Sequence, residues 1–186
     1  MASKTEICNQ ALVLIGGGLI SDFISDTTKA GQLCRLFYDS TVEELLEQYP
    51  WTFAAKRINL SAPTQDEPKF GFENSFQLPA DYLDIHETNL LDGSWRVEDL
   101  RILTNADEIS IVYVARITDT SKYTPLFRQT LIYLLAAKLA IPLTRSLQMA
   151  TLYHQAVERT LSRSENANSH PNNEKFESDT LIQVRR

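Results

Sequence analysis

Cysteine is scarce in this chain, and that scarcity excludes a class of protein. The 186 residues include only two cysteines, Cys8 and Cys34. Two are too few for the disulfide framework of a small secreted domain, and both fall on the apolar side of a predicted helix. We therefore expect small buried side chains in a reducing compartment, with a disulfide between them as the alternative.

Histidine and glycine are also sparse, and their pattern carries no catalytic or metal-binding motif. The three histidines fall on a predicted strand, a predicted helix and the C-terminal tail, at His86, His154 and His170. None has a second histidine at helical spacing or a nearby cysteine, as a zinc site requires. The sequence lacks a Gly-x-Ser-x-Gly elbow, and Gly16-Gly17-Gly18 is not followed by the Lys-Ser/Thr pair of a phosphate loop. We expect no cofactor, no metal and no enzymatic activity as the main role.

Positive charge is in deficit. Eighteen Lys and Arg face 24 Asp and Glu, which gives a net charge of −6. Because tight binding to nucleic acid depends on clustered basic side chains at the phosphates, this balance argues against it. Four arginines lie among aromatic and acidic residues of the predicted sheet, and we interpret them as partners in ion pairs rather than as a single-strand binding surface. They are Arg57, Arg96, Arg101 and Arg116.

Long apolar runs are missing as well. No basic patch followed by an apolar segment stands at the N-terminus, so no secretory signal is expected. The run Leu131–Ile141 is too short to cross a membrane, and Lys138 interrupts it. We expect no membrane association and a protein kept in the cytoplasm or in a particle assembled there. The hydrophobic share of 43% suffices for a core without disulfides or metal.

Helical periodicity is present at both ends of the chain. Apolar residues recur at helical spacing in four segments, at Ser3–Ile15, Lys29–Tyr49, Pro125–Ile141 and Ser146–Leu161. Ser3 and Glu6 match a capping box at the first start. Gly16, Pro50 and Pro142 are expected to end the first, second and third helices. The third has the widest apolar face and is expected to be the most buried.

Between Trp51 and about Ile117 the period changes from helical to alternating. We expect the chain to be extended from Trp51 onward, with a first strand that ends at Leu60. The strand near 108–117 is apolar on both faces toward its end, so it is expected to be central in the sheet.

Turn residues in this part predict two hairpins. Asp92-Gly93 is expected to form a two-residue primed turn between the segment that ends at Leu91 and the one that begins at Ser94. A second hairpin is expected to join 97–103 to 108–117 across residues 104–107.

These patterns together predict an α+β fold. It consists of a four-helix body (two N-terminal and two C-terminal helices), an inserted antiparallel β subdomain and an extended C-terminal tail. The predicted bounds are 1–50 and 122–166 for the body, 51–121 for the subdomain and 167–186 for the tail. The tail carries an apolar, strand-prone run on a polar tether, too small to be stable alone. It is either disordered or docks on another molecule by adding a strand or filling a groove.

Several short motifs follow one another in a distinctive order. They are Glu6–Leu12, Ile15-Gly16, Leu36–Asp39, Glu44–Leu46, Pro50–Ala54, Phe76–Tyr82, Tyr113–Asp119, Pro125–Phe127 and Leu139–Thr144. Their order and spacing resemble the tail tubular protein A family of short-tailed bacteriophages. These proteins are head-to-tail adaptors that extend the portal. The resemblance covers about Ser3 to Leu161, and the tail matches the family only in being a C-terminal extension.

The resemblance implies a structural virion protein. The family forms a ring of about twelve subunits, a homododecamer, under the portal protein. Helices form the ring body, and the β part faces the distal tail, or nozzle, protein. The ring is part of the channel for DNA ejection, and DNA passes without specific binding, which agrees with the negative charge of this chain. The implied location is the tail or neck of the virion, after assembly in the host bacterial cytoplasm.

Two sets of candidate binding residues follow. The apolar, strand-prone end of the tail is the candidate portal-binding segment, with Phe176, Leu181, Ile182, Val184, Arg185 and Arg186. The predicted turn of the β subdomain is the candidate interface with the distal tail, with Asp92, Gly93, Trp95 and Arg96.

Three other interpretations stay open. A head-completion connector of a long-tailed phage has the same task but lacks a large β insertion. A small virion-associated cell-wall hydrolase would need a cleft with two carboxylates of separated pKa, and Glu43, Glu44 and Asp84 are the residues to substitute. A free cytoplasmic interaction module would stay monomeric even with a portal present.

Overall fold

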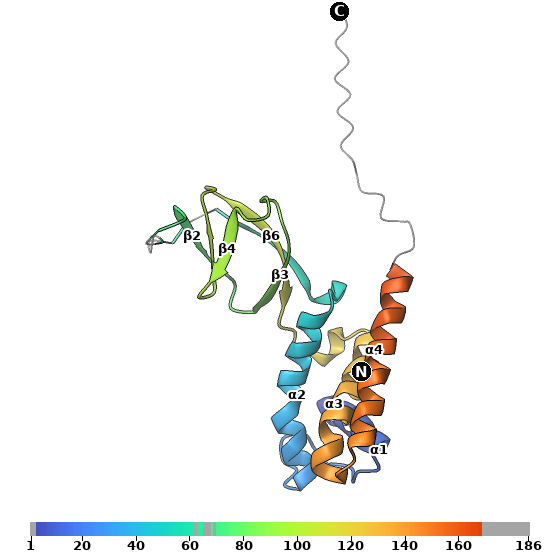
Figure 1. Ribbon diagram of the computed structural model, residues 1–186. Helices are drawn as coiled ribbons and strands as arrows, with labels where there is room; N and C mark the ends of the chain where they lie inside the picture. Colours follow the sequence, from blue (N-terminus) through green and yellow to red (C-terminus); the bar gives the residue numbers. More distant parts are fainter. Residues whose placement is uncertain (1–2, 62, 65–67, 69, 169–186) are drawn as a thin grey trace, which may run out of the picture.

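The protein combines helices and antiparallel sheets, which confirms the α+β class. A computed structural model describes residues 3–61, 63–64, 68 and 70–168. Within them the helices are α1 (Lys4–Leu14), α2 (Lys29–Gln48), α3 (Pro125–Thr144) and α4 (Leu147–Asn168). The strands are β1 (Ala55–Leu60), β2 (Asn74–Gln77), β3 (Tyr82–Thr88), β4 (Trp95–Glu98), β5 (Arg101–Thr104) and β6 (Ile109–Ala115). The helices gather in a helical body, and the strands form a β module that projects from one end of it (Figure 1).

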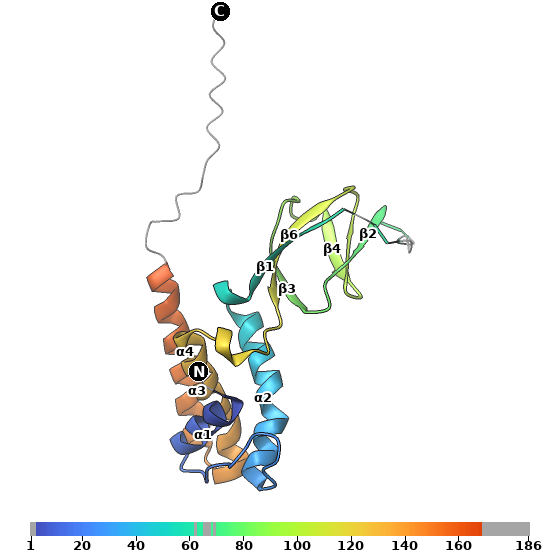
Figure 2. The same ribbon diagram turned by 180° about the vertical axis from the view of Figure 1, so that it is seen from behind.

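Helix α3 lies at the centre of the helical body. The other helices all pack against it, with α1 toward the viewer in Figure 2. Half of its 20 residues are buried, which confirms the expectation that it is the most buried helix. By length and composition α3 also satisfies the requirements of a membrane-crossing segment. Its apolar side chains contact three other helices, so its place in the core of the helical body accounts for this composition.

Side-chain caps set the starts of the helices. Hydroxyl groups of Ser3, Thr28 and Thr124 accept hydrogen bonds from backbone N–H groups in the first turns of α1, α2 and α3. Helix α1 ends as expected, because Gly16 adopts a φ of +70° that glycine tolerates without a Cβ clash. There the N–H of Gly17 donates to Leu12 O at 2.8 Å, which satisfies one of the last helical carbonyls.

The expectation that Pro142 ends the third helix is wrong. Pro142 lies inside α3, which continues to Thr144 and ends where Arg145 takes a left-handed φ of 57°. A proline this near the C-terminus disturbs only the last turn, and other bonds stabilise it. The Pro142 carbonyl accepts a hydrogen bond from Lys29 Nζ at 2.8 Å, and Thr144 Oγ1 donates to Ala140 O at 2.7 Å.

The chain after Pro50 is not extended at once, as the alternating pattern had predicted. Thr52–Ala54 form a short 3₁₀ helix, and strand β1 begins only at Ala55. The turn allows Trp51 and Phe53 to stay with the helical body instead of entering the sheet, because both aromatic rings contact Phe127 of α3.

The six strands form two three-stranded antiparallel sheets. Their orders are β1-β6-β3 and β2-β5-β4, so the chain changes sheet at most connections. Strand β6 is central in its sheet, as expected from its apolar pattern. Buried side chains of both sheets, Phe76 and Ile102 on one side and Ile109 and Ile111 on the other, belong to one continuous apolar core.

Neither predicted hairpin is present. Asp92-Gly93 does form a turn, in which Ser94 N–H donates to Leu91 O, but it connects β3 to β4 in different sheets. Only Gly93 has a positive φ, +81°, so the turn is not of the primed type. The segment 104–107 likewise connects β5 and β6, which are not paired with each other.

The actual hairpin joins β4 to β5 through Asp99-Leu100. Glu98 is paired with Arg101, and both turn residues have positive φ, 48° and 57°, as a two-residue primed turn requires. Because neither residue is a glycine, no hairpin was predicted at this position.

Candidate assembly surfaces

An aromatic cluster anchors the β module on the helical body. The two connections between them carry Trp51, Phe53 and Tyr123, whose rings all contact Phe127 at centroid distances of 5.0, 5.0 and 4.7 Å. Trp51 Nε1–H donates to Leu45 O at 2.8 Å, so the polar atom of this buried ring is satisfied. The cluster fixes both connections to the same point of α3.

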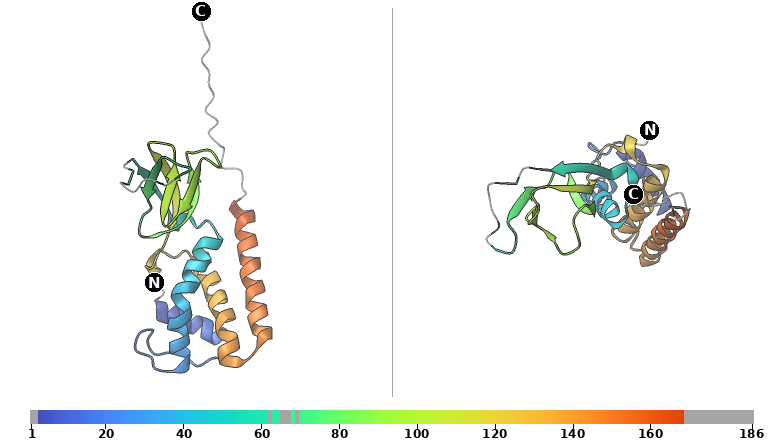
Figure 3. Two further views of the ribbon diagram at one scale, coloured as in Figure 1. Left: turned by 60° about the vertical axis from the view of Figure 1, so that its left-hand side comes forward. Right: turned by 90° about the horizontal axis from the view of Figure 1, so that it is seen from above.

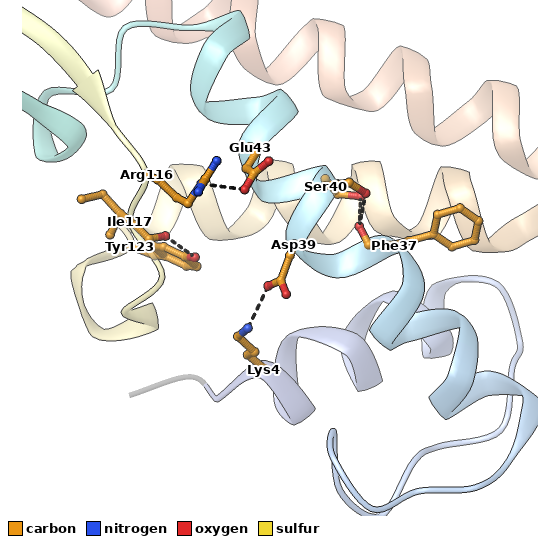
Figure 4. Close-up of polar contacts among 9 residues, drawn as sticks. Lys4, Phe37, Asp39, Ser40, Glu43, Arg116, Ile117 and Tyr123 are labelled. Atoms are coloured by element: carbon orange, nitrogen blue, oxygen red, sulfur yellow. Dashed lines mark hydrogen bonds and ion pairs between the residues drawn. The ribbon is translucent and has the colours of Figure 1, made fainter. Parts of the chain in front are cut away.

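Polar contacts reinforce this junction. In Figure 4, Arg116, just after β6, forms an ion pair with Glu43 of α2, with Nε and Oε1 2.7 Å apart. The hydroxyl of Tyr123 donates to Ile117 O at 3.0 Å and closes the same connection. One turn earlier on α2, Lys4 Nζ pairs with Asp39 Oδ1 at 2.8 Å and ties α1 to α2. Thus one of the arginines of the β region serves as an intramolecular ion-pair partner.

Asp81 links three strands at the base of the β module. Its carboxylate accepts hydrogen bonds from Lys56 Nζ and, at 3.1 Å, from the Tyr113 hydroxyl. Its carbonyl accepts from Arg116 N–H at 2.7 Å. The bond from Lys56 holds the pKa of Asp81 below the usual carboxyl value, so the carboxylate is charged at neutral pH.

An open apolar groove runs between α1 and α3. Its volume is about 680 Å³, and it is lined by Ser3, Thr5, Glu6, Asn9, Gln10, Val13, Leu14, Leu19, Gln129 and Ile132. Val13 is 61% exposed, on a helix whose opposite face is in the core. Leu19, in the loop after α1, is similarly exposed. Because these apolar side chains are adjacent and concave, the groove is a candidate contact surface.

The outer face of α4 is a second candidate surface. One side of α4 packs on α3 through Ala150 and Val157, which are buried. The other side is exposed and includes Leu152, 53% exposed, with Gln155 and Arg159 one and two turns farther on. The C-terminal end of α4 lies at the end of the body from which the β module projects (Figure 1).

The third candidate surface is the loop end of the β module. Loops 70–73, 89–94 and 104–106 enclose an open cavity of about 550 Å³. Phe70 and Leu91 are 89% and 81% exposed there. Seen from above in Figure 3, the β module extends to one side of the helices, so this region is accessible.

The predicted distal-tail residues are distributed around this loop end. Asp92, Gly93 and Arg96 are exposed, and Arg96 Nη1 lies 3.6 Å from Glu98 Oε1. Trp95 instead packs partly buried against the core, and its Nε1 is buried without a hydrogen-bond partner. The exposed surface at this position is therefore formed by the turn rather than by the indole ring.

The titratable groups of the described segments form no metal-binding cluster. No set of three or more His, Cys, Asp or Glu side chains in those segments is placed to hold an ion. Cys8 and Cys34 are buried free thiols, and the hydrogen bond that Cys8 donates to Cys34, together with burial, raises the pKa of Cys8. Glu43 and Glu44 pair with Arg116 and Lys138.

The predicted portal-binding residues, Phe176, Leu181, Ile182, Val184, Arg185 and Arg186, lie outside the described residues, as does His170. The last described element next to them is α4, which continues to Asn168, beyond the predicted end at Leu161.

In comparisons with known proteins, no family model matches the chain and no curated protein gives a significant match. The function is therefore argued from the surfaces described above, together with the sequence resemblance.

Sequence reasoning missed the α1/α3 groove and the outer face of α4. The signal was available in part, because Val13 and Leu152 fall outside the apolar stripes that predict burial. Single apolar residues on a polar helix face are common, however, and only the fold shows that Val13 borders a concave surface.

Proposed function

We propose that the protein is a head-to-tail adaptor of a short-tailed bacteriophage. In this proposal, copies of the chain form a ring of about twelve subunits through their helical bodies. The ring attaches to the portal protein, and the β modules meet the distal tail protein. The ring then forms part of the channel through which DNA is ejected, without a main enzymatic role and without a cofactor.

The observation that carries this proposal is the two-part architecture. A helical body and a β module are joined by two connections at one aromatic cluster, and each part has its own exposed apolar surface. Val13 and Leu19 lie on the body, while Phe70 and Leu91 lie at the loop end of the module. A chain with apolar surfaces on two separate parts is suited to contact different partners at each.

The charge supports a channel role. The net charge of −6 on each chain would be repeated around a ring and would repel phosphate groups. DNA could then slide through without adhering, whereas a basic lining would retain it.

The described surface also bears on the alternatives. A long-tailed head-completion connector is expected to lack a large β insertion, whereas the described residues between α2 and α3 form six strands. For the hydrolase alternative, Glu43 and Glu44 each form an ion pair, and Asp84 is exposed on β3. None of these three residues lines the α1/α3 groove or the cavity at the loop end of the β module.

The test is assembly with the portal protein of the same virus. Purified chain is run on a sizing column with light scattering, alone and mixed with portal. We expect a large complex of defined stoichiometry with portal, and a chain that stays monomeric with portal present would contradict the proposal.

A truncation tests the role of the tail within the same assay. A chain that ends at Asn168 retains every described helix and strand but lacks the candidate residues from Phe176 to Arg186. We propose that it folds normally, with an unchanged far-ultraviolet circular dichroism spectrum, and no longer attaches to portal. Unchanged attachment would rule out the tail as the portal-binding segment.

A further inference from the structure

Helix α1 carries an exposed stripe that runs from an acidic side chain through an amide to an apolar side chain. The stripe consists of Glu6, Gln10 and Val13, spaced by four and then three residues, and all three side chains are exposed. This spacing places them on one face of the helix. All three also line the α1/α3 groove.

Helix α4 carries a matching stripe in reverse order, with the apolar residue first along the chain and the charged residue last. Arg159, Gln155 and Leu152 are spaced by four and then three residues when followed backward along the chain, and all are exposed. Each stripe spans eight residues, from the first to the last about 10 Å along the helix. If the two helices lie antiparallel against each other, the stripes match. The acidic side chain meets the basic one, the two glutamines meet, and the two apolar side chains meet.

We propose that α4 of one copy of the chain docks in the α1/α3 groove of the next copy. In this contact Arg159 pairs with Glu6, Gln155 meets Gln10, and Leu152 enters the groove beside Val13. The inference rests on the proposed ring and names the surfaces that join its subunits.

The charged side chains of the two stripes form no ion pair within the described segments, and their apolar side chains are exposed. Neither Glu6 nor Arg159 belongs to any ion pair among residues of the described segments. The Glu6 carboxylate accepts a 3.4 Å hydrogen bond from Gln10 of its own helix, and the Glu6 backbone N–H donates to the Ser3 cap. Leu152 and Val13 are 53% and 61% exposed. Docking would remove this apolar surface from water, and the ion pair would fix the register and direction of the two helices.

A second copy fits this groove better than an unrelated partner because both halves of the contact belong to one chain. The two stripes lie on different helices, so a copy that uses its α4 on one neighbour keeps its own groove for another. Such a head-to-tail contact extends from subunit to subunit and closes into a ring when the rotation allows.

Charge exchange tests the contact in the portal assembly assay. Glu6→Arg and Arg159→Glu each place like charges together, so we expect the chain concentration for half-assembly to rise about tenfold, as for a loss of about 1.4 kcal/mol. The double variant with both substitutions restores the opposite charges and should assemble like the unsubstituted chain. Glu158→Arg, also exposed on α4 but outside the stripe, is the matched control and should have no effect.

A crosslinking experiment locates the contact independently. Two preparations, Val13→Cys and Leu152→Cys, are mixed and treated with a short bismaleimide, so a linked pair can form only between copies. We expect linkage in the mixture and not in either preparation alone. A mixture of Leu36→Cys and Leu152→Cys, with Leu36 exposed on α2, is the control and should not link. The native thiols are buried.

The outcomes separate this inference from the proposed function. If the unsubstituted chain forms no oligomer with portal, the proposed function is contradicted. If it forms one that Glu6→Arg and Arg159→Glu leave unchanged, or that links equally well in the control pair, only the α1–α4 contact is overturned. Assembly that stops at two copies would also overturn it, because a ring requires further extension.

Discussion

Arg116 Nε lies 2.7 Å from Glu43 Oε1, and this ion pair connects the end of the β module to the C-terminal half of α2. It lies next to the aromatic cluster, on the connection by which the described chain passes from β6 back to α3. The orientation of the module relative to the body therefore depends on a contact that is partly open to water.

Removal of this ion pair should loosen the junction more than it destabilises the fold. Both side chains are more than one third exposed, so Arg116→Ala should lower the free energy of unfolding by less than about 1 kcal/mol. Amide hydrogen exchange in 116–123 should nevertheless accelerate, because the connection loses its tie to α2. The control is Arg96→Ala, which removes a 3.6 Å pair within the β module. Unchanged exchange in 116–123 would show that the aromatic cluster alone holds the junction.

Phe127 should be among the residues whose truncation destabilises the protein most. It is fully buried, and its ring contacts Trp51, Phe53 and Tyr123. Phe127→Ala would leave a cavity and lower the free energy of unfolding by about 3–5 kcal/mol in a urea titration. Phe70→Ala, at an 89% exposed position, should stay within about 0.5 kcal/mol. Comparable losses for both variants would contradict the cluster as an anchor.

The helices could be predicted from the sequence because their signals are local. The cap at Ser3 and the glycine stop at Gly16 act within one helical turn, and both are confirmed. Pro142 misled the prediction because one bond from Lys29, 113 residues away, helps to hold the last turn of α3.

The pairing of the strands could not be predicted in the same way. Turn chemistry at Asp92-Gly93 favours a change of direction, but it does not determine which strand the chain then joins, and here it joins the other sheet. The candidate surfaces could be predicted even less, because the exposed Val13 indicates a contact surface only once the groove beside it is known from the fold.

Gly31→Ala should destabilise the protein, although alanine is the better helix former. A Cβ atom at this position in α2 would lie 2.6 Å from Asp26 Oδ1 and 2.9 Å from the Asp26 carbonyl. Replacement of glycine by alanine inside a helix usually raises the free energy of unfolding by about 0.5–1 kcal/mol. Here the substitution would displace the loop before α2, so we expect the melting temperature to fall. Gly18→Ala, which meets no atom within 4 Å, is the control and should not lower it. A higher melting temperature for Gly31→Ala would contradict this prediction, because it would show that the loop can move without loss of stability.

Acid should weaken the same loop through Asp26. Hydrogen bonds from Thr28 and Ser21 hold the pKa of Asp26 at about 2, below that of an unfolded aspartate. Because the unfolded chain then binds the proton first, this contribution to stability is complete above pH 4 and is lost as the pH falls from about 4 to about 2. Asp26→Asn should therefore lower the melting temperature at pH 7, with a difference from the unsubstituted chain that narrows over this interval. A difference that is constant with pH would contradict the assignment; Asp92→Asn, on an exposed loop, is the control.

Leu100→Gly should stabilise the protein. Leu100 occupies the second position of the β4–β5 turn with a φ of 57°, where a leucine side chain is disfavoured, and it is 59% exposed, so little packing is lost with the side chain. We expect the free energy of unfolding to rise by about 1 kcal/mol, since the relief of strain exceeds the entropy that glycine adds to the unfolded chain. The backbone bond from Leu78 N–H to Leu100 O at 3.0 Å does not involve the side chain and should persist. Leu91→Gly, exposed but without a positive φ, is the matched control and should be neutral or destabilising. If Leu100→Gly is destabilising in a urea titration, the side chain makes a contribution that outweighs the strain, and a primed turn alone would not explain why the hairpin forms here.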